Sequence, residues 1–191
     1  MSEEDNPHFL KGHALDLKQI RLDLYRLACY FEASRHLVGR ETNGNASEDE
    51  YIPDLPKEFF KDEVSRVLLQ SAIVLRILDD ESEADRDERN PFICGTLELD
   101  GGSEPLGLRE ACNKILHARR MNYDKCSSEQ RTPRDGRHDW YRPYLYLYGV
   151  QARKHWRAAL DVRAFINHGA RLLRARTLSE FIEWNEKYDG A

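Results

Sequence analysis

The stretch KEFFKDEVSRVLLQSAIVLRILDD, residues 57–80, decides the expected fold. Its apolar side chains recur with the 3.6-residue period of a helix from Phe59 to Leu78, with no Pro or Gly between them. Residues 13–38 carry the same pattern, again without a helix breaker. Two long amphipathic helices can bury their apolar faces against each other. The sequence therefore predicts an antiparallel pair of long helices as the hydrophobic backbone of the molecule.

Turn-forming and polar residues separate the other predicted elements. Residues 39–57 contain Asn, Gly, Pro and an acidic run, and residues 122–142 are polar and rich in arginine, so both are expected to be mobile loops. Residues 92–99 have β character and predict a short strand. Residues 106–120 predict a third helix, entered through Ser103-Glu-Pro105, where Ser can cap and Pro suits the first turn.

The C-terminal third begins with a change of period. Tyr144-Leu-Tyr-Leu-Tyr148 alternates strictly, and residues 155–160 alternate more weakly around Trp156, which predicts a β-hairpin. Asp161 is placed to cap a helix that follows it. Thr177 and Glu180 form a capping box for a last, separate helix.

These elements predict a single domain over residues 1–191, because 191 residues suffice for one hydrophobic core. Its helical core is expected over about 13–120, and the hairpin with the C-terminal helices over about 143–188. The expected fold class is mainly α, with a minor α+β part: a long antiparallel helix pair, further helices and a small antiparallel sheet of two or three strands.

Composition excludes several classes of protein. With 40% hydrophobic and 33% charged residues, the chain is neither fibrous nor wholly disordered. Gln70, Ser71 and Arg76 interrupt its longest apolar stretch, so no membrane span is expected. The acidic N-terminus does not match a secretory signal, and the four cysteines form no C-x-x-C pair, which together suggest a cytoplasmic protein with reduced thiols. Close metal-ligand pairs and phosphate-binding loops are also missing, so no metal and no cofactor are expected.

The net charge of −5 hides a split along the chain. Residues 1–105 hold 12 Lys and Arg against 24 Asp and Glu, whereas residues 106–191 hold 17 against 10. The basic half could attract RNA or an acidic protein, or the two halves could neutralise each other within the fold or across a homodimer. If the basic half binds a partner, the candidate contacts are Arg119, Arg120, Arg131, Arg134, Arg137, Arg153 and Arg157.

The third predicted helix gathers Arg109, Asn113, His117 and Arg120 on one face. Histidine can transfer protons in either direction near neutral pH, and arginine stabilises charge that develops on a phosphate. Such a set could cleave RNA without a metal, with Arg109, Asn113 and His117 as the catalytic residues. The alternative is an ordinary solvent-facing helix surface.

This arrangement resembles the HEPN domains (higher eukaryotes and prokaryotes nucleotide-binding), in which a long helix pair precedes a helix carrying Arg, a polar residue and His. The resemblance covers residues 13–120 and rests on Arg109 and His117, with the polar Glu110 directly after Arg109. Seven residues separate Arg109 from His117, whereas the family pattern has four to six. The resemblance implies an all-α fold, dimerisation, a composite metal-independent ribonuclease site, and a role in bacterial toxin or phage-defence systems.

Tyr144, Tyr146 and Tyr148 share one face of the predicted strand. They could form a stacking platform for bases, with Arg153 or Arg157 beside it, or they could pack across the hairpin against Trp156. The first functional hypothesis is therefore an α-helical binding module that engages a protein or nucleic acid through its arginine-rich half. The alternative is a HEPN-like endoribonuclease.

Overall fold

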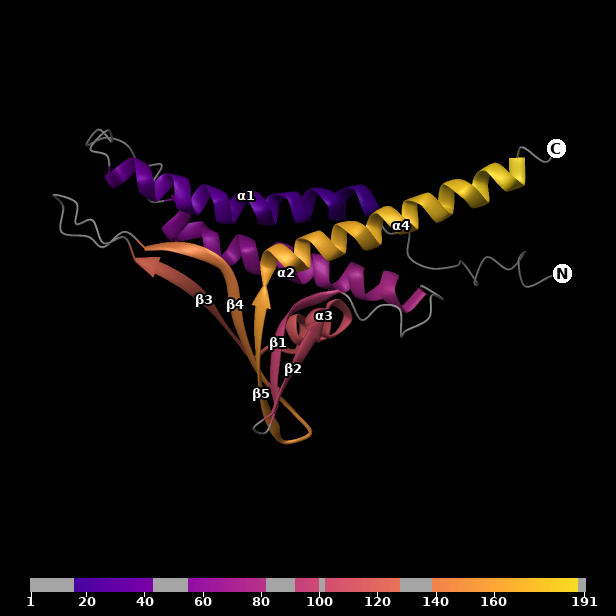
Figure 1. The fold of residues 1–191 in the computed structure, drawn as a ribbon. Helices are drawn as coiled ribbons and strands as arrows, with labels where there is room; N and C mark the ends of the chain where they lie inside the picture. Colours follow the sequence, from indigo (N-terminus) through magenta and orange to yellow (C-terminus); the bar gives the residue numbers. More distant parts are fainter. Residues whose placement is uncertain (1–15, 43–54, 82–91, 100–101, 128–138, 189–191) are drawn as a thin grey trace.

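The computed structural model describes residues 16–42, 55–81, 92–99, 102–127 and 139–188. The predicted helix pair is present as α1 (Leu17–Thr42) and α2 (Leu55–Glu81), which run antiparallel side by side (Figure 1). α1 extends four residues past its predicted end, and α2 extends past its predicted range at both ends, so residues 39–42 and 55–57 are helical rather than part of a loop. The remainder of that predicted loop lies outside the described residues. Leu27, Val64 and Leu68 are fully buried between the elements and anchor the core.

The mainly α prediction is wrong, because the described chain forms an antiparallel sheet of five strands beside its four helices. The fold class is α+β, and the all-α fold that the family resemblance implied does not hold. In the sheet the strands follow the order β2-β1-β5-β4-β3. Their bounds are β1 (Ile93–Leu99), β2 (Gly102–Gly107), β3 (Arg120–Ser127), β4 (Asp139–Gln151) and β5 (Lys154–Asp161).

The two strands that sequence analysis missed are the edge strands. β2 contains Ser103-Glu-Pro105, which is therefore not the entrance to a helix, and β3 occupies the start of the loop predicted over 122–142. An edge strand pairs on one side only, so it tolerates Pro and polar residues better than a central strand does. Residues 128–138 of that predicted loop lie outside the described part of the chain.

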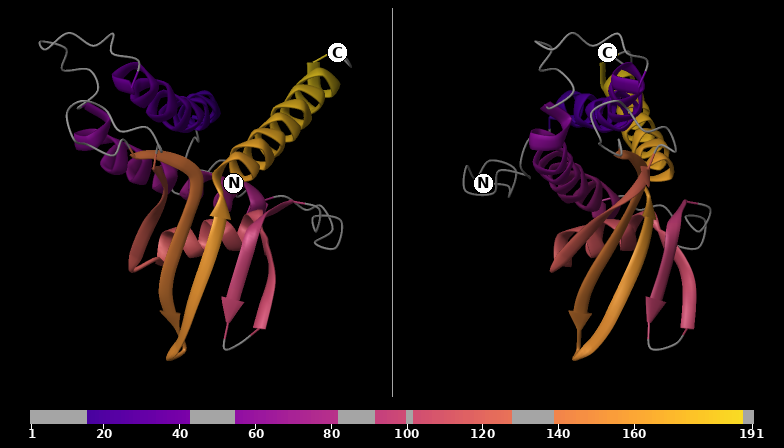
Figure 2. Two further views of the ribbon diagram at one scale, coloured as in Figure 1. Left: turned by 60° about the vertical axis from the view of Figure 1, so that its left-hand side comes forward. Right: turned by 90° about the vertical axis from the view of Figure 1, so that its left-hand side faces the viewer.

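One face of the sheet packs against the helices. α3 (Leu108–His117) lies on this face and contacts α2 on its other side, with Ala111, Cys112 and Ile115 buried (Figure 2). Leu97, Leu145 and Leu160 point into the same core from three adjacent strands. α1, α2 and α4 lie over one end of the strands, so the other end of the sheet, with the β4–β5 turn, extends away from these three helices (Figure 1).

α4 (Val162–Tyr188) follows β5 directly. The predicted cap is confirmed, because Asp161 Oδ1 accepts hydrogen bonds from the backbone N–H groups of Arg163 (2.9 Å) and Ala164 (3.1 Å). The predicted break at Thr177 is wrong. Its hydroxyl donates to the carbonyl of Leu173 in the preceding turn (3.0 Å), and the helix continues without interruption.

Candidate nucleic-acid interface

Arg109, the first residue of the predicted catalytic face, is turned towards the acidic half of the molecule. Its guanidinium donates to Asp79 Oδ2 at 2.7 Å and also bonds Asp80, both at the end of α2. The hydrogen bond from Arg109 lowers the pKa of the Asp80 carboxyl below its usual value. Arg109 therefore ties α3 to α2, as expected if the two halves of the chain neutralise each other.

Asn113 belongs to the same polar network. Its Oδ1 accepts from Arg76 Nε at 2.8 Å, and its Nδ2 donates to Glu110 Oε2 at 3.0 Å. Glu110 in turn pairs with the buried ammonium of Lys114 at 2.8 Å, which also donates to Gln151 Oε1 at 3.0 Å. The network thus runs from α2 across α3 to the far end of β4.

His117 lies apart from this network. It is the last residue of α3, exposed, and about 12 Å along the helix axis from Arg109. It borders a polar hollow of about 440 Å³ together with Arg119, Lys114 and Gln151. Within one chain the structure therefore does not bring Arg109 and His117 together.

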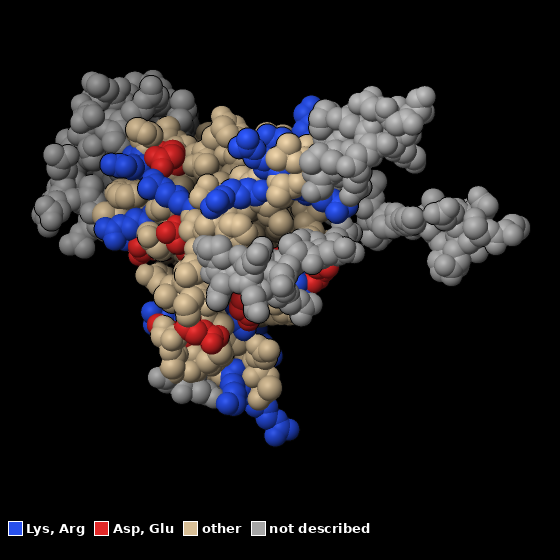
Figure 3. Space-filling view, turned by 45° about the vertical axis from the view of Figure 1, so that its right-hand side comes forward, with Lys and Arg blue, Asp and Glu red and all other residues tan. Residues whose placement is uncertain are grey.

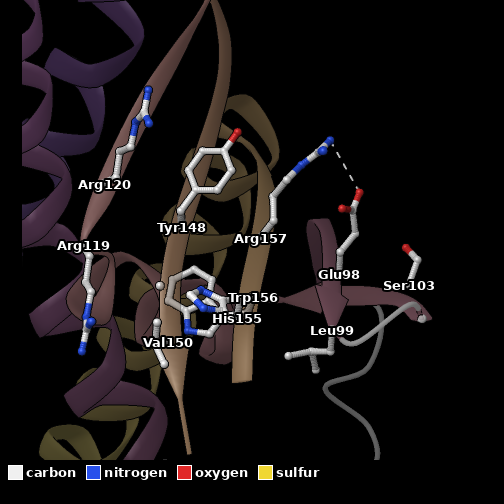
Figure 4. A pocket seen from close by; sticks show the side chains of 12 residues that line it. Glu98, Leu99, Ser103, Arg119, Arg120, Tyr148, Val150, His155, Trp156 and Arg157 are labelled. Atoms are coloured by element: carbon white, nitrogen blue, oxygen red, sulfur yellow. Dashed lines mark ion pairs between the residues drawn. The ribbon is translucent and has the colours of Figure 1, made fainter. Parts of the chain in front are cut away.

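The sheet face opposite α3 carries a row of side chains from adjacent strands. Tyr148 on β4 stands opposite Arg120 on β3 and opposite Arg157 on β5. Directly opposed residues point to the same side of a sheet. Arg120, Tyr148 and Arg157 therefore form one row, which we call the Arg-Tyr-Arg row, and Figure 4 shows them side by side. No described helix covers this face (Figure 2).

The tyrosines do not pack on Trp156, so that alternative is wrong. Trp156 faces the other way, with only 3% of its surface exposed, and its ring lies 4.8 Å from Lys114 Nζ of α3. Tyr144 is 43% exposed, whereas Tyr146 and Tyr148 are half-buried on the open face. The guanidinium of Arg157 lies 5.6 Å from the Tyr146 ring, which makes a cation–π contact. The tyrosine face is thus available to a ligand and is flanked by positive charge.

The Arg-Tyr-Arg row lies in an open groove of about 700 Å³ that crosses the distal part of the sheet. Arg157 is paired only loosely, because its Nη2 is 3.5 Å from Glu98 Oε1 and both side chains are 47% exposed. Arg120 Nε donates to Asn122 Oδ1 at 3.1 Å on the surface. The groove is lined by Glu98, Leu99, Gly102, Ser103, Arg119, Arg120, Tyr148, Gly149, Val150, His155, Trp156 and Arg157.

The structure brings together three of the seven predicted binding arginines, namely Arg119, Arg120 and Arg157, in this groove. Arg153 is exposed in the β4–β5 turn, with a left-handed backbone (φ 67°). Figure 3 shows Lys and Arg side chains at the distal tip, over this turn. The other three predicted arginines, Arg131, Arg134 and Arg137, lie outside the described residues.

Sequence reasoning missed the groove residues on β1 and β2, above all Glu98 and Ser103. The signal for Glu98 was its place in the alternation of a short strand, two residues after Thr96. That alternation could not show which distant strand lies beside β1. The pairing of β1 with β5 puts Glu98 opposite Arg157, across more than fifty residues of chain.

Comparisons with family models, with curated proteins and with solved structures found no match to this chain. The described helices include none that is both long enough and apolar enough to cross a membrane. Among the described residues, no group of His, Cys, Asp or Glu is arranged to hold a metal ion.

Proposed function

We propose that the protein binds single-stranded RNA on the open face of its sheet. The observation that carries this proposal is the Arg-Tyr-Arg row, in which an aromatic ring lies between two arginines on an uncovered surface. Unstacked bases bind to aromatic side chains in many sheet-based RNA interfaces, and stacking tolerates every base. Guanidinium groups on either side suit the phosphates that precede and follow a stacked base.

The shape of the groove favours a single strand. It crosses the strands of the sheet and is open to solvent, so a flexible chain can lie along it with its bases turned towards Tyr148. Three arginines and one carboxylate line it, which gives the groove a positive balance although the whole chain is acidic. An acidic peptide would be drawn by the same charge but would gain less from the tyrosine, so RNA is the better match.

The test is fluorescence anisotropy with a labelled oligouridine about ten nucleotides long. Replacing Tyr148 with Ala should weaken binding by a factor of about 5 to 150, because stacking on one aromatic side chain is worth about 1–3 kcal/mol. Tyr148→Phe keeps the ring and should bind nearly as well as the unmodified protein. Tyr25 is 66% exposed on α1, away from the groove, so Tyr25→Ala serves as the matched control.

Two results would overturn the proposal. One is an unmodified protein that does not bind the oligonucleotide, and the other is a Tyr148→Ala protein that binds it as tightly as before. A labelled oligoglutamate peptide is tested in parallel. If it binds and the RNA does not, the groove is a docking surface for an acidic protein segment.

The position of His117 favours cleavage of RNA as a second candidate function. The hollow beside His117 shares Arg119, Val150 and Trp156 with the groove, so a strand in the groove can continue past the imidazole. In this candidate ribonuclease site, Arg119 takes the place of Arg109 as the arginine near the phosphate to be cleaved. Incubation of RNA with the protein in EDTA should then give fragments. His117→Ala should abolish them, whereas His36→Ala, at an exposed position of α1 outside the groove, should not. If the RNA stays intact, cleavage is contradicted and RNA binding remains the proposed function.

A further inference from the structure

Glu98 is the one carboxylate among the described residues that line the groove. A negative charge opposes the binding of a polyanion, so the position of Glu98 between Arg157 and Ser103 suggests a specific role. Its contact with Arg157 Nη2 is 3.5 Å long, whereas charge-assisted hydrogen bonds are about 2.7–2.9 Å. A carboxylate has about four acceptor sites. Glu98 therefore keeps most of its capacity to accept hydrogen bonds from a ligand.

The register fixes where this acceptor lies relative to the stacking ring. Glu98 on β1 is opposite Arg157 on β5, and Arg157 is opposite Tyr148 on β4, so the carboxylate and the tyrosine are two strands apart, about 10 Å. A base stacked on Tyr148 does not cover that distance. The β1–β2 end of the groove, where Leu99 and Ser103 also lie, is thus free for the base of the neighbouring nucleotide.

We propose that Glu98 makes this end of the groove selective for guanine, an inference that rests on the proposed binding of single-stranded RNA. The Watson–Crick edge of guanine presents N1–H and N2–H side by side, and the two oxygens of one carboxylate can accept both. Uracil presents a single N3–H between two carbonyl oxygens, which a carboxylate repels. The hydroxyl of Ser103, opposite Glu98 on the neighbouring strand, is placed to donate to guanine O6.

The test compares three labelled oligonucleotides at one salt concentration: all uridine, the same with one central guanosine, and the same with inosine in that place. Inosine keeps N1–H and lacks the amino group. A two-point contact to a base edge is worth about 1–3 kcal/mol of discrimination, so the unmodified protein should prefer the guanosine oligonucleotide about tenfold. Inosine should recover only part of that preference.

Glu98→Gln should remove the preference for guanosine without weakening the binding of oligouridine, because the amide no longer offers two acceptors. Glu104→Gln is the matched control. Glu104 is exposed on β2 and stands opposite Leu97, so it belongs to the other face of the sheet. The Glu104→Gln substitution removes one negative charge, as Glu98→Gln does, and should leave the preference for guanosine unchanged.

The results separate the two proposals. Equal binding of the guanosine and uridine oligonucleotides, or a Glu98→Gln protein that still prefers guanosine, contradicts the role of Glu98 and leaves RNA binding standing. A protein that binds none of the three oligonucleotides contradicts both.

Discussion

Gly149 shows how one residue connects the core of the sheet to its open face. It stands opposite Trp156, and a Cβ atom built on it would lie 2.1 Å from Cζ2 of that ring. The indole therefore occupies the space that any other side chain would need. Tyr148, the residue before Gly149 in β4, points to the other face. The same stretch of backbone therefore makes room for the tryptophan and positions the stacking ring.

Gly149→Ala should destabilise the protein by about 1–3 kcal/mol, because the added methyl group forces the tryptophan from its place in the core. Urea unfolding followed by tryptophan fluorescence measures the change. Gly107→Ala is the control, since a Cβ at Gly107 would meet nothing within 4 Å. Equal stability of the Gly149→Ala protein and the unmodified one would mean that the ring has room to move.

Two thiols also report on the core. Burial raises the pKa of Cys94 and of Cys112 to about 12, so neither forms a thiolate at neutral pH in the folded state. Only the thiolate reacts with alkylating reagents. In native protein at about pH 8, iodoacetamide should therefore modify Cys94 and Cys112 only after urea is added, as mass spectrometry of the peptides would show. Rapid labelling of either without urea would contradict their burial.

The same shifts set a pH dependence at alkaline pH. An unfolded chain loses these two protons near pH 8.5, whereas the folded protein holds them until about pH 12. The folded state thus binds more protons over this window, and its stability should fall as the pH rises through it.

At the scale of elements, a polar network between α2 and α3 holds Arg109 and Asn113, two of the three residues predicted to be catalytic. Hydrogen bonds from Arg109 and Arg76 lower the pKa of Asp80. For Glu110, burial opposes ionisation, yet hydrogen bonds from Lys114 and Asn113 outweigh it, so its pKa is also lowered. Carboxylates with lowered pKa values stabilise the fold above the ordinary carboxyl range, and this stabilisation is lost as the pH falls.

Asp80→Asn should therefore lower the urea midpoint at neutral pH and reduce its dependence on acid pH. Unfolding curves between about pH 3 and 7 measure both effects. Asp62→Asn, at an exposed position of the same helix, is the control and should change neither. An Asp80→Asn protein with the full acid dependence would show that other carboxylates cause it.

Arg109→Gln separates the structural role of this network from a role in binding. Because Arg109 lies at the α2–α3 contact and not in the groove, the substitution should lower stability while the affinity for oligouridine stays unchanged at a temperature where the variant is folded. Anisotropy titration and thermal unfolding give the two readouts. A loss of affinity without a loss of stability would mean that Arg109 takes part in RNA binding or in catalysis.

The elements differ in how well the sequence predicts them. Long helices such as α2 show their period over many turns, and β4 shows strict alternation in Tyr144–Tyr148, so both are predicted correctly. β2 is a short edge strand that contains Pro105 and resembles the entrance to a helix. β3 is an edge strand of mostly polar residues and resembles a loop. Because these two strands were missed, the predicted fold class was mainly α instead of α+β.

The candidate site shows the same limit. The tyrosine face and three arginines were recognised because each pattern is local. Their meeting in one groove, and the addition of Glu98, depend on the pairing of β5 with β1 and of β4 with β3, which no local pattern encodes. Likewise, the sequence places Arg109 and Asn113 on one helix, but α3 ends at His117 and Arg120 belongs to β3. The partners of Arg109 and Asn113, Asp79 and Arg76, come from another helix.

At the scale of the whole molecule, ion pairs between the halves neutralise part of the charge split. Arg109 pairs with Asp79, and Arg163 of α4 pairs with Glu32 of α1 at 2.6 Å. The groove differs, because no described side chain forms an ion pair with Arg119 or Arg120. The acidic half therefore neutralises the arginines near the helices and leaves positive charge at the distal end of the sheet.

This distribution predicts a modest salt dependence of binding. If Arg119, Arg120 and Arg157 each neutralise one phosphate, the logarithm of the association constant should fall with the logarithm of salt concentration with a slope of about −2, at roughly 0.7 per contact on a single strand.

Arg119→Gln should weaken binding to all sequences and reduce the slope by about 0.7. Arg21→Gln, at an exposed position of α1 far along the chain from the groove, should do neither. Anisotropy titrations over a range of salt concentrations measure these slopes. A flat dependence would mean that the groove arginines do not reach phosphates, whereas a much steeper one would require basic residues beyond the groove to take part.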